Sequence, residues 1–530
     1  MAELFPGRGA ERRLPRFAGI WTTTFGTLTI TQSGSAVRGT YTHKGGRVEG
    51  ELEDGVVRGR WFEPEHGKEG SFELTIDDSD NTFGGSWKYA GSAGWDGPWN
   101  GVRLELPSEA EGGNPGGWNS YPEGPLLAGP MVGEVSETEA RIWIQARDTS
   151  PLSISLFSDD GEEIGAALSP ERAEWLCAAF HVTGLRPGQR YRYEISSENG
   201  RTDRHELRTA PEAGARWLKI AYGSCFWDYS NARLTIFDAI AREGADVFLM
   251  IGDTSYCAEL DARSEHTLML THLRNRNNDA IRRLLAEVPV LGIWDDHDFG
   301  PNDADGRYEG KDTSLRAFQR CWAQARFGLP DVPGVFSSVR MGPAEIFLPD
   351  SRYHKRVSGA EILGRAQLDW LLTGLGESAA PVKIIASPTQ VLPEHPVKNG
   401  WDSFRTDAPG ELEEILSFIE SNDIQGVVFV SGDLHMANLI HVPGRDVGGR
   451  AGPEFWELTS SPLANAPWNE PQVGRGIDRY LISEVFDRTN YGVVDIDLDR
   501  TGEEIALVLK GEHGETLLRQ PIALADLRAR

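Results

Sequence analysis

Four apolar stretches after Trp217 run directly into side chains that can bind a metal ion. They end, in chain order, in Gly-Ser-Cys (223–225), Gly-Asp-Thr-Ser-Tyr (252–256), Trp-Asp-Asp-His-Asp (294–298) and Ser-Gly-Asp-Leu-His (431–435). Open α/β sheets build their sites at the carboxyl ends of their strands. We therefore expect these polar groups to meet in one place.

The candidate ligands combine carboxylates with a thiol, a phenol and an imidazole. Such a hard, anionic set suits a trivalent iron ion beside a Ca²⁺-like ion better than it suits a Cys-rich structural zinc site. Taken singly, each residue has an ordinary explanation as a buried cysteine, a core tyrosine or a turn cap. The residue types alone do not assign one ion to each ligand. The candidates are Cys225, Asp253, Tyr256, Asp296, Asp433 and His435.

The elements that position these groups follow from an alternation of apolar and amphipathic segments after Trp217. Strands alternating with helices predict a layered α/β domain, and the return to strand patterns in the last hundred residues predicts a second sheet completed late. The expected strands are 218–222, 246–251, 288–293, 345–348, 382–386 and 427–430, and the expected helices lie near 231–243, 280–287, 313–326, 366–375 and 411–420.

Two all-β regions are expected before this α/β domain. Residues 17–106 show short alternating runs separated by glycines, which predicts a small β-barrel or meander, and 107–125 has the composition of a linker. Residues 126–211 are again strand-like, and 184–193 resembles the tyrosine corner of a fibronectin type III or immunoglobulin-like sandwich. We assign five tryptophans of the first region to its core and rim rather than to a ligand site: Trp21, Trp61, Trp87, Trp95 and Trp99.

The composition excludes several classes of protein. The chain carries 53 Lys and Arg against 80 Asp and Glu, a net charge of −27, so we expect no binding to a nucleic-acid backbone. No apolar run is long enough for a membrane span. Arg12 and Arg13 are not followed by an apolar core, so no signal peptide is seen, and we expect a cytoplasmic protein, or a periplasmic or secreted one if an export signal is missing. The oligomeric state is left open.

The motifs GSC, GDxxY, WDDHDxGxND and GDLH, in this order, resemble those of the PhoD-like alkaline phosphatases and phosphodiesterases, a branch of the calcineurin-like metallophosphoesterases. The segments 345–355, 364–375 and 455–463 resemble parts of the same family, and the resemblance covers about 126–500. It implies that 216–530 is a metallophosphoesterase domain.

The resemblance also implies a ligand set. Cys225, Asp253, Tyr256 and His435 would surround Fe³⁺, while Asp253, Asp296 and Asp433 would hold one or two Ca²⁺ ions, or other divalent ions, with Asp253 as the bridge.

Four further residues receive roles outside the metal ligands. His297 and Asp298 match the catalytic histidine–acid pair of the superfamily, in which a protonated imidazole stabilises charge or protonates the leaving oxygen. Asn302 is a candidate for a further metal or phosphate contact. Arg352 could clamp phosphate or pair with Asp350 instead.

The implied reaction is hydrolysis of phosphomonoesters or phosphodiesters by a metal-activated water. The sequence disfavours two alternatives. A catalytically inert scaffold that binds a partner through its N-terminal β-domains is disfavoured by the intact ligand set. Serine hydrolases, zincin proteases and P-loop NTPases are disfavoured because G-x-S-x-G at a strand-to-helix turn, HExxH and GxxxxGK[ST] are absent.

Overall fold

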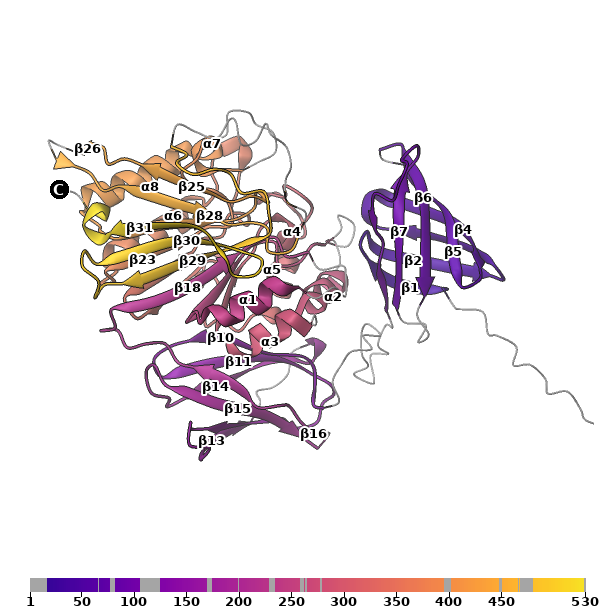
Figure 1. Cartoon of the computed structure of the whole chain (residues 1–530), viewed down its shortest axis with the longest axis horizontal. Coiled ribbons are helices and arrows are strands. Elements are labelled where there is room, and N and C mark those ends of the chain that lie inside the picture. The colour runs from indigo at the N-terminus through magenta and orange to yellow at the C-terminus, as the bar shows by residue number, and fades with distance from the viewer. Residues whose placement is uncertain are drawn as a thin grey trace, which may run out of the picture. The chain divides into compact units, whose positions relative to one another are not determined.

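The computed structural model describes 17–64, 66–76, 82–104, 124–168, 174–198, 200–227, 234–257, 262, 265–276, 279–394, 402–447, 450–465, 467 and 480–528. These residues form two compact units, one holding the strands before Pro107 and the other holding the rest of the fold. Each unit is described by itself (Figure 1). The expected linker, 107–125, lies outside the described residues except for its last two positions.

The first unit is one antiparallel sheet that closes on itself. Successive strands pair as a meander, and the sheet closes because β1 pairs with β9 and β6 pairs with β7. Side chains of alternate positions point inward and form its aromatic core. The strands are β1 (Gly19–Thr23), β2 (Gly26–Ser33), β3 (Ala36–Tyr41), β4 (Gly46–Glu53), β5 (Val56–Glu63), β6 (Lys68–Ile76), β7 (Thr82–Tyr89), β8 (Gly97–Pro98) and β9 (Gly101–Leu104), with a 3-10 turn, η1 (His43–Gly45).

The second unit begins with two small antiparallel sheets, ordered β10-β11-β14 and β13-β12-β15-β16, with β17 also on β15. The Arg186 amide donates to the Tyr191 hydroxyl at 2.8 Å, so a tyrosine does hold the preceding turn. The Tyr193 hydroxyl donates to the carbonyl of Ala286 at 2.6 Å and ties these sheets to the α/β layers. A domain boundary near 211 therefore stays a prediction. The strands are β10 (Leu126–Val135), β11 (Glu139–Ala146), β12 (Ser153–Phe157), β13 (Glu163–Leu168), β14 (Cys177–Thr183), β15 (Arg190–Ser197), β16 (Gly200–Arg201) and β17 (His205–Arg208).

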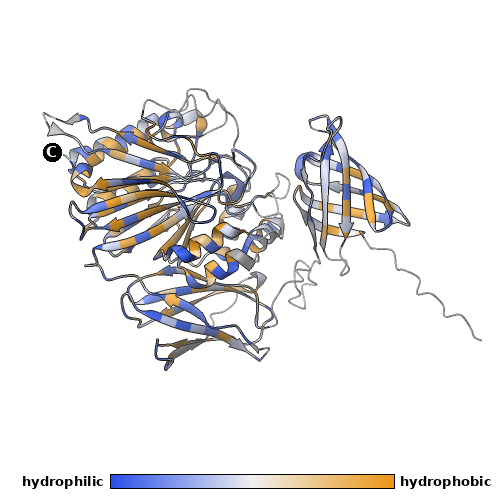
Figure 2. Cartoon of the chain, in the orientation of Figure 1, coloured by the Kyte–Doolittle hydropathy of each residue, from blue (hydrophilic) through white to orange (hydrophobic). Residues whose placement is uncertain are grey.

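Two six-stranded mixed sheets form the centre of the second unit. The Tyr222 hydroxyl of β18 donates to the carbonyl of Leu458 in β28 at 2.7 Å, which joins the two sheets. Figure 2 shows apolar residues concentrated along these strands. The first sheet is β20 (Val290–Ile293), β19 (Val247–Ile251), β18 (Trp217–Gly223), β29 (Asn490–Asp497), β30 (Glu504–Gly511) and β31 (Thr516–Ala523). The second is β21 (Ser337–Met341), β22 (Ala344–Leu348), β23 (Val382–Ala386), β24 (Val427–Ser431), β28 (Phe455–Thr459) and β25 (Asn438–Val442).

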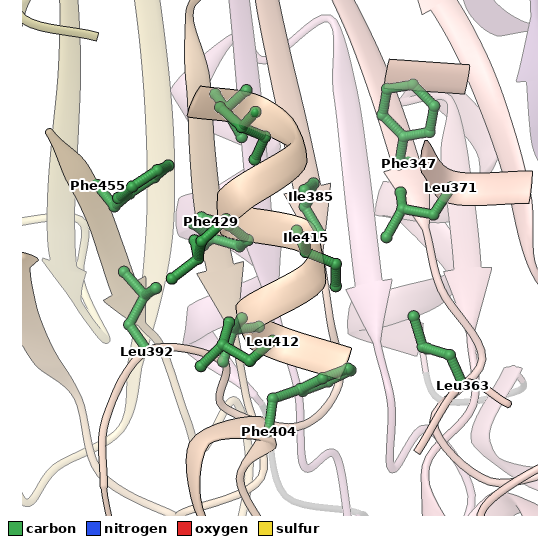
Figure 3. Packing of buried hydrophobic residues seen from close by; sticks show 14 of the residues in the cluster. Phe347, Leu363, Leu371, Ile385, Leu392, Phe404, Leu412, Ile415, Phe429 and Phe455 are labelled. Carbon is green, nitrogen blue, oxygen red and sulfur yellow. The ribbon is translucent and has the colours of Figure 1, made fainter. Parts of the chain in front are cut away.

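Helices pack against these sheets through apolar faces. Figure 3 shows Leu412 and Ile415 of α8 beside Phe429 of the second sheet, and these residues share one apolar core with Phe455 and with residues of α6. In the described part of the chain, every helix is too short or too polar to span a membrane. The helices are α1 (Thr235–Glu243), α2 (Glu265–Arg276), α3 (Asp279–Glu287), α4 (Asp296–Phe299), α5 (Lys311–Cys321), α6 (Arg365–Glu377), α7 (Phe404–Asp407) and α8 (Pro409–Ser421).

All six strands expected after Trp217 are present, and a helix overlaps each of the five expected helical segments. Helix α2 was not predicted. Its buried positions include His272, Asn275 and Arg276, so polar side chains occupy the face where an apolar repeat would have revealed a helix.

Candidate metal centre

The strands that carry the candidate ligands are neighbours within the sheets. Strands β18, β19 and β20 run parallel in the first sheet, and Cys225, Asp253 and Asp296 follow their carboxyl ends. Asp433 and His435 follow the end of β24 in the second sheet. The structure thus brings together groups that are about 200 residues apart in the chain, as expected from the strand-end rule.

The first group of potential ligand atoms contains Cys225, Asp253 and His435, whose nearest ligand atoms all lie within 4.8 Å of one another. Cys225 Sγ lies 3.6 Å from Asp253 Oδ2. The Tyr256 hydroxyl donates to Asp253 Oδ2 at 2.9 Å and lies 3.3 Å from His435 Nε2. These four residues are the ones that the resemblance groups around a ferric ion.

A second group contains Asp253, Asp296 and His297, again with ligand atoms within 4.8 Å of one another. Asp253 belongs to both groups, so its carboxylate lies where a ligand shared by two ions would lie. The Asp433 side chain is in neither group. Its backbone carbonyl accepts from Cys225 Sγ at 3.4 Å, and its amide donates to Ser224 Oγ at 3.1 Å.

Four of the six candidate ligands have left-handed backbone conformations. The φ angles are 61° at Cys225, 52° at Asp253, 69° at Asp433 and 51° at His435. Each such residue costs on the order of 1–3 kcal/mol and persists only where the surroundings hold it, a pattern typical of functional sites. Gly432 lets its backbone lie close to the Ser224 side chain, because a Cβ at position 432 would lie 2.3 Å from Ser224 Oγ.

The centre concentrates negative charge away from water. Burial raises the pKa of Asp253 well above its usual value, and the carboxylates of Asp296 and Asp295 raise it further. Burial also raises the pKa of Cys225, with Asp253 adding to the effect. At Asp296 burial acts in the same direction, but His297 and Arg352 outweigh it and hold the pKa below its ordinary value. Buried anions that raise one another's pKa are stabilised by cations, so this donor set fits metal ions.

His297 lies at the edge of this cluster with a half-buried side chain. Its amide donates to Asp253 Oδ1 at 3.3 Å, and its ring centroid lies 4.4 Å from that of Tyr256. The imidazole is therefore close to the carboxylate that both groups share while keeping some contact with solvent.

Asp298 is fully buried and fixes the loop that carries two candidate ligands. Its carboxylate accepts from the amides of Thr254 at 2.9 Å and Ser255 at 2.7 Å, from both of their hydroxyls, and from the amide of Asp295 at 3.1 Å. Among the described contacts, none joins Asp298 to the imidazole of His297. The histidine–acid pair inferred from the resemblance therefore has no described side-chain hydrogen bond between its two members.

Arg352 is buried among acidic side chains. Its guanidinium pairs with Asp295, lies 2.8 Å from Asp402 Oδ2, and lies 3.9 Å from Asp296 Oδ1. Asp350 instead accepts from the backbone amide of Arg352 at 2.9 Å. Neither interpretation made from the sequence, a phosphate clamp or a side-chain pair with Asp350, anticipated the pairing with Asp295 and Asp402.

Asn302 is exposed, and its side-chain amide donates to Asp303 Oδ2 at 2.7 Å. The Asp303 amide in turn donates to Asp296 Oδ2 at 2.7 Å. The Asn302 side chain thus binds Asp303, which in turn binds Asp296. None of the described hydrogen bonds joins Asn302 directly to a candidate ligand.

The sequence interpretation missed two residues beside His435. Asn465 Nδ2 lies 3.4 Å from His435 Nε2, and the His435 amide donates to Ser461 Oγ at 3.1 Å. Ser461 lies in the segment 455–463, which resembles the family, and Asn465 follows that segment, but neither residue belongs to one of the ligand motifs.

Comparison with solved structures places the fold among the phosphatases. The chain resembles the structure of PhoD with a TM-score of 0.61 at 15% identity, over 75% of this chain and 93% of that one. It resembles a purple acid phosphatase from yellow lupin (Lupinus luteus) seeds with a TM-score of 0.55 at 11% identity, over 92% and 93% of the two chains. These likenesses concern the fold alone and define a layered α/β phosphatase fold.

The chain belongs to the PhoD-like phosphatase family, whose model matches residues 220–502, more than half of its length. A second model, of a domain of unknown function, matches residues 123–213. Alkaline phosphatase D of Bacillus subtilis (strain 168) is 24% identical over an alignment of 329 residues that covers 50% of this chain and 55% of that protein, so the match spans about half the length of this relative. Family membership confirms the resemblance and the predicted class, phosphoric ester hydrolase.

Proposed function

We propose that this protein hydrolyses phosphate esters at a centre of two metal ions that share the carboxylate of Asp253. The observation that carries the proposal is the membership of Asp253 in both groups of close ligand atoms. Two cations at this point would offset the buried negative charge that the two groups accumulate.

The donor chemistry supports Fe³⁺ at Cys225, Asp253, Tyr256 and His435, because thiolate and phenolate are strongly donating anionic ligands. Oxygen ligands from Asp253, Asp296 and Asp433 suit one or two Ca²⁺ ions or other divalent ions. When bound, such ions supply Lewis acidity and neutralise charge on the phosphoryl group.

The chain's own residues divide the remaining work. His297, half-buried beside Asp253, is placed to donate a proton to the leaving oxygen or a hydrogen bond to a phosphoryl oxygen. Asp298 holds the loop 253–256 in position through its hydrogen bonds to Thr254 and Ser255. Arg352 fixes Asp295 and Asp402, and after His297 its positive charge lowers the pKa of Asp296.

The substrate class is a phosphorylated small molecule or a phosphodiester, with no binding to a nucleic-acid backbone, in keeping with the net charge of −27.

The test uses p-nitrophenyl phosphate and bis-p-nitrophenyl phosphate with the full-length protein, its Asp253→Ala variant and, as a control, Asp369→Ala on the exposed surface of α6. We expect the wild type and Asp369→Ala to hydrolyse at least one ester and Asp253→Ala to lose that activity. Absence of turnover in a metal-loaded, folded wild type, over a wider panel of monoesters and diesters, would favour the inert scaffold instead.

A further inference from the structure

The N-terminal barrel contains a cavity of about 120 Å³, and most of its lining residues are Phe, Tyr or Trp. Strand β5 contributes Trp61, strand β7 contributes Trp87 and Tyr89, and the others come from the β1–β2 turn, the end of β3 and the segment after β8. The aromatic residues that line the cavity are Phe25, Tyr41, Trp61, Trp87, Tyr89 and Trp99. This unit lies outside both ranges matched by the family models, 220–502 and 123–213.

The rings meet one another edge to face, so they stand at steep angles to one another around the cavity. The ring centroids of Trp87 and Tyr89 lie 5.0 Å apart, with 87° between the ring planes. Those of Trp61 and Trp87 lie 5.8 Å apart, with 79° between the planes. Phe25 lies 5.0 Å from Trp99 at 83°. Each ring face carries negative electrostatic potential, so a box of such faces attracts a cation that has shed its water.

Glycines make room for this arrangement. A Cβ at Gly46 would lie 1.9 Å from the ring of Tyr41, and a Cβ at Gly70 would lie 2.7 Å from the ring of Trp61. Both positions therefore exclude any larger residue while these rings keep their places. The strand alternation that puts Trp61 inward also puts Glu63, two residues later, on the same face.

Glu63 places a carboxylate in this aromatic wall. The residue is 6% exposed, and the Tyr41 hydroxyl donates to its Oε1 at 3.4 Å. Of the basic groups that the structure describes, only His43 lies within 4.0 Å of it, at 3.9 Å. Burial, and then Lys44, lower the pKa of His43 to about 4, so this imidazole is neutral near pH 7. Glu63 thus has hydrogen-bond support but no described cationic partner.

We propose that this cavity binds an alkylammonium head group, with the trimethylammonium of choline as the model ligand. The rings would surround the methylated cation, and Glu63 would supply the opposite charge. The cavity volume suits a trimethylammonium group, since a buried apolar cavity of about 150 Å³ holds a benzene molecule. Lys44 also lines the cavity, and the proposal requires its ammonium to remain on the solvent side when the methylated cation enters.

The test is a calorimetric titration of the full-length protein with choline and with 3,3-dimethyl-1-butanol, which has the same shape without the charge. Three tryptophans line the cavity, so tryptophan fluorescence gives a second readout. We expect choline to bind at least about tenfold more tightly than its neutral isostere, because the cation–π and carboxylate interactions act only on the charge. Equal affinity for the two compounds, or no detectable binding of choline at concentrations up to roughly tens of millimolar, would overturn the proposal.

Variants separate the cavity from the rest of the barrel. Glu63→Gln and Trp87→Ala should each weaken choline binding by about tenfold or more, and Tyr89→Ala, at the exposed rim, should weaken it without endangering the fold. Trp95→Ala is the matched control, because Trp95 is 47% exposed and does not line the cavity. Binding of choline that survives all three cavity variants would contradict the proposal, as would binding of glucose or cellobiose in place of choline. None of these readouts depends on ester hydrolysis.

Discussion

The Tyr256 hydroxyl stands between two candidate ligands from different sheets, 2.9 Å from Asp253 Oδ2 and 3.3 Å from His435 Nε2. Burial raises the pKa of this phenol, and Asp253 and Cys225 raise it further. Without a cation, the phenolate is therefore strongly disfavoured at this position. A metal ion that binds the phenolate would supply the compensating charge.

This relationship predicts the colour of the protein. If Tyr256 and Cys225 bind Fe³⁺, the purified protein should show a visible charge-transfer band, and Tyr256→Phe should shift or abolish it. Absorption spectra of both proteins at equal iron content give the answer. A colourless, fully active preparation that contains zinc and no iron would refute the ferric assignment.

The second prediction separates the chemistry of His297 from metal binding. His297→Ala should lower kcat by about 10² or more, because the variant lacks the proton donor or charge-stabilising group, while iron and calcium contents remain near those of the wild type. Steady-state kinetics and metal analysis are made on the same samples. Parallel losses of metal and activity would instead identify His297 as a ligand.

Asp298 carries a prediction about the loop it holds. Asp298→Asn removes a charged acceptor from the amides of Thr254 and Ser255, so we expect a loss of about 1–3 kcal/mol of stability and weaker metal retention. Thermal melting and metal content measure the two effects, with Asp369→Asn on the surface of α6 as the control. A variant that keeps the wild-type melting temperature and metal content would show that Asp298 is not needed to hold this loop.

The α/β layers could be predicted from the sequence because their strands are short apolar runs with period and length typical of buried strands. Helix α2 could not, since His272 and Arg276 are buried where apolar residues are expected. The positions of Cys225, Asp253 and Asp296 at strand ends likewise predicted that these residues lie close together. The pairing of Arg352 with Asp295 and Asp402 could not be predicted, because it joins three loops whose proximity in the fold no local sequence pattern indicates.

The assignment of the N-terminal tryptophans shows a similar limit. Trp21 and Trp99 are buried in the barrel core, and Trp95 is exposed at its surface, as core and rim residues would be. Trp61, Trp87 and Trp99 nevertheless line a cavity together with Glu63. Alternation along one strand fixes which side chains point inward, but it does not tell whether they fill the interior or leave a space.

The buried His272 predicts a loss of stability in acid. Burial lowers its pKa to about 3, below its ordinary value of 6.5. Between these two pH values, His272 is protonated in the unfolded chain and neutral in the folded chain. The contribution of neutral His272 to the free energy of unfolding is fully present above pH 6.5. It is lost as the pH falls toward 3, at up to about 1.4 kcal/mol per pH unit. Urea denaturation at several pH values should show a flatter acid dependence for His272→Leu than for the wild type. The exposed His513→Gln variant should retain the wild-type slope, and identical slopes for His272→Leu and the wild type would contradict this account.

The most direct test of the shared carboxylate is the metal content per chain of the wild type, Asp253→Ala, Cys225→Ser and Asp296→Ala, measured by mass spectrometry after identical purification. If Asp253 bridges two ions, Asp253→Ala loses both iron and calcium, while Cys225→Ser loses chiefly iron and Asp296→Ala chiefly calcium. Retention of both metals by a folded Asp253→Ala, or a wild type that holds only one metal ion per chain, would contradict the two-ion centre.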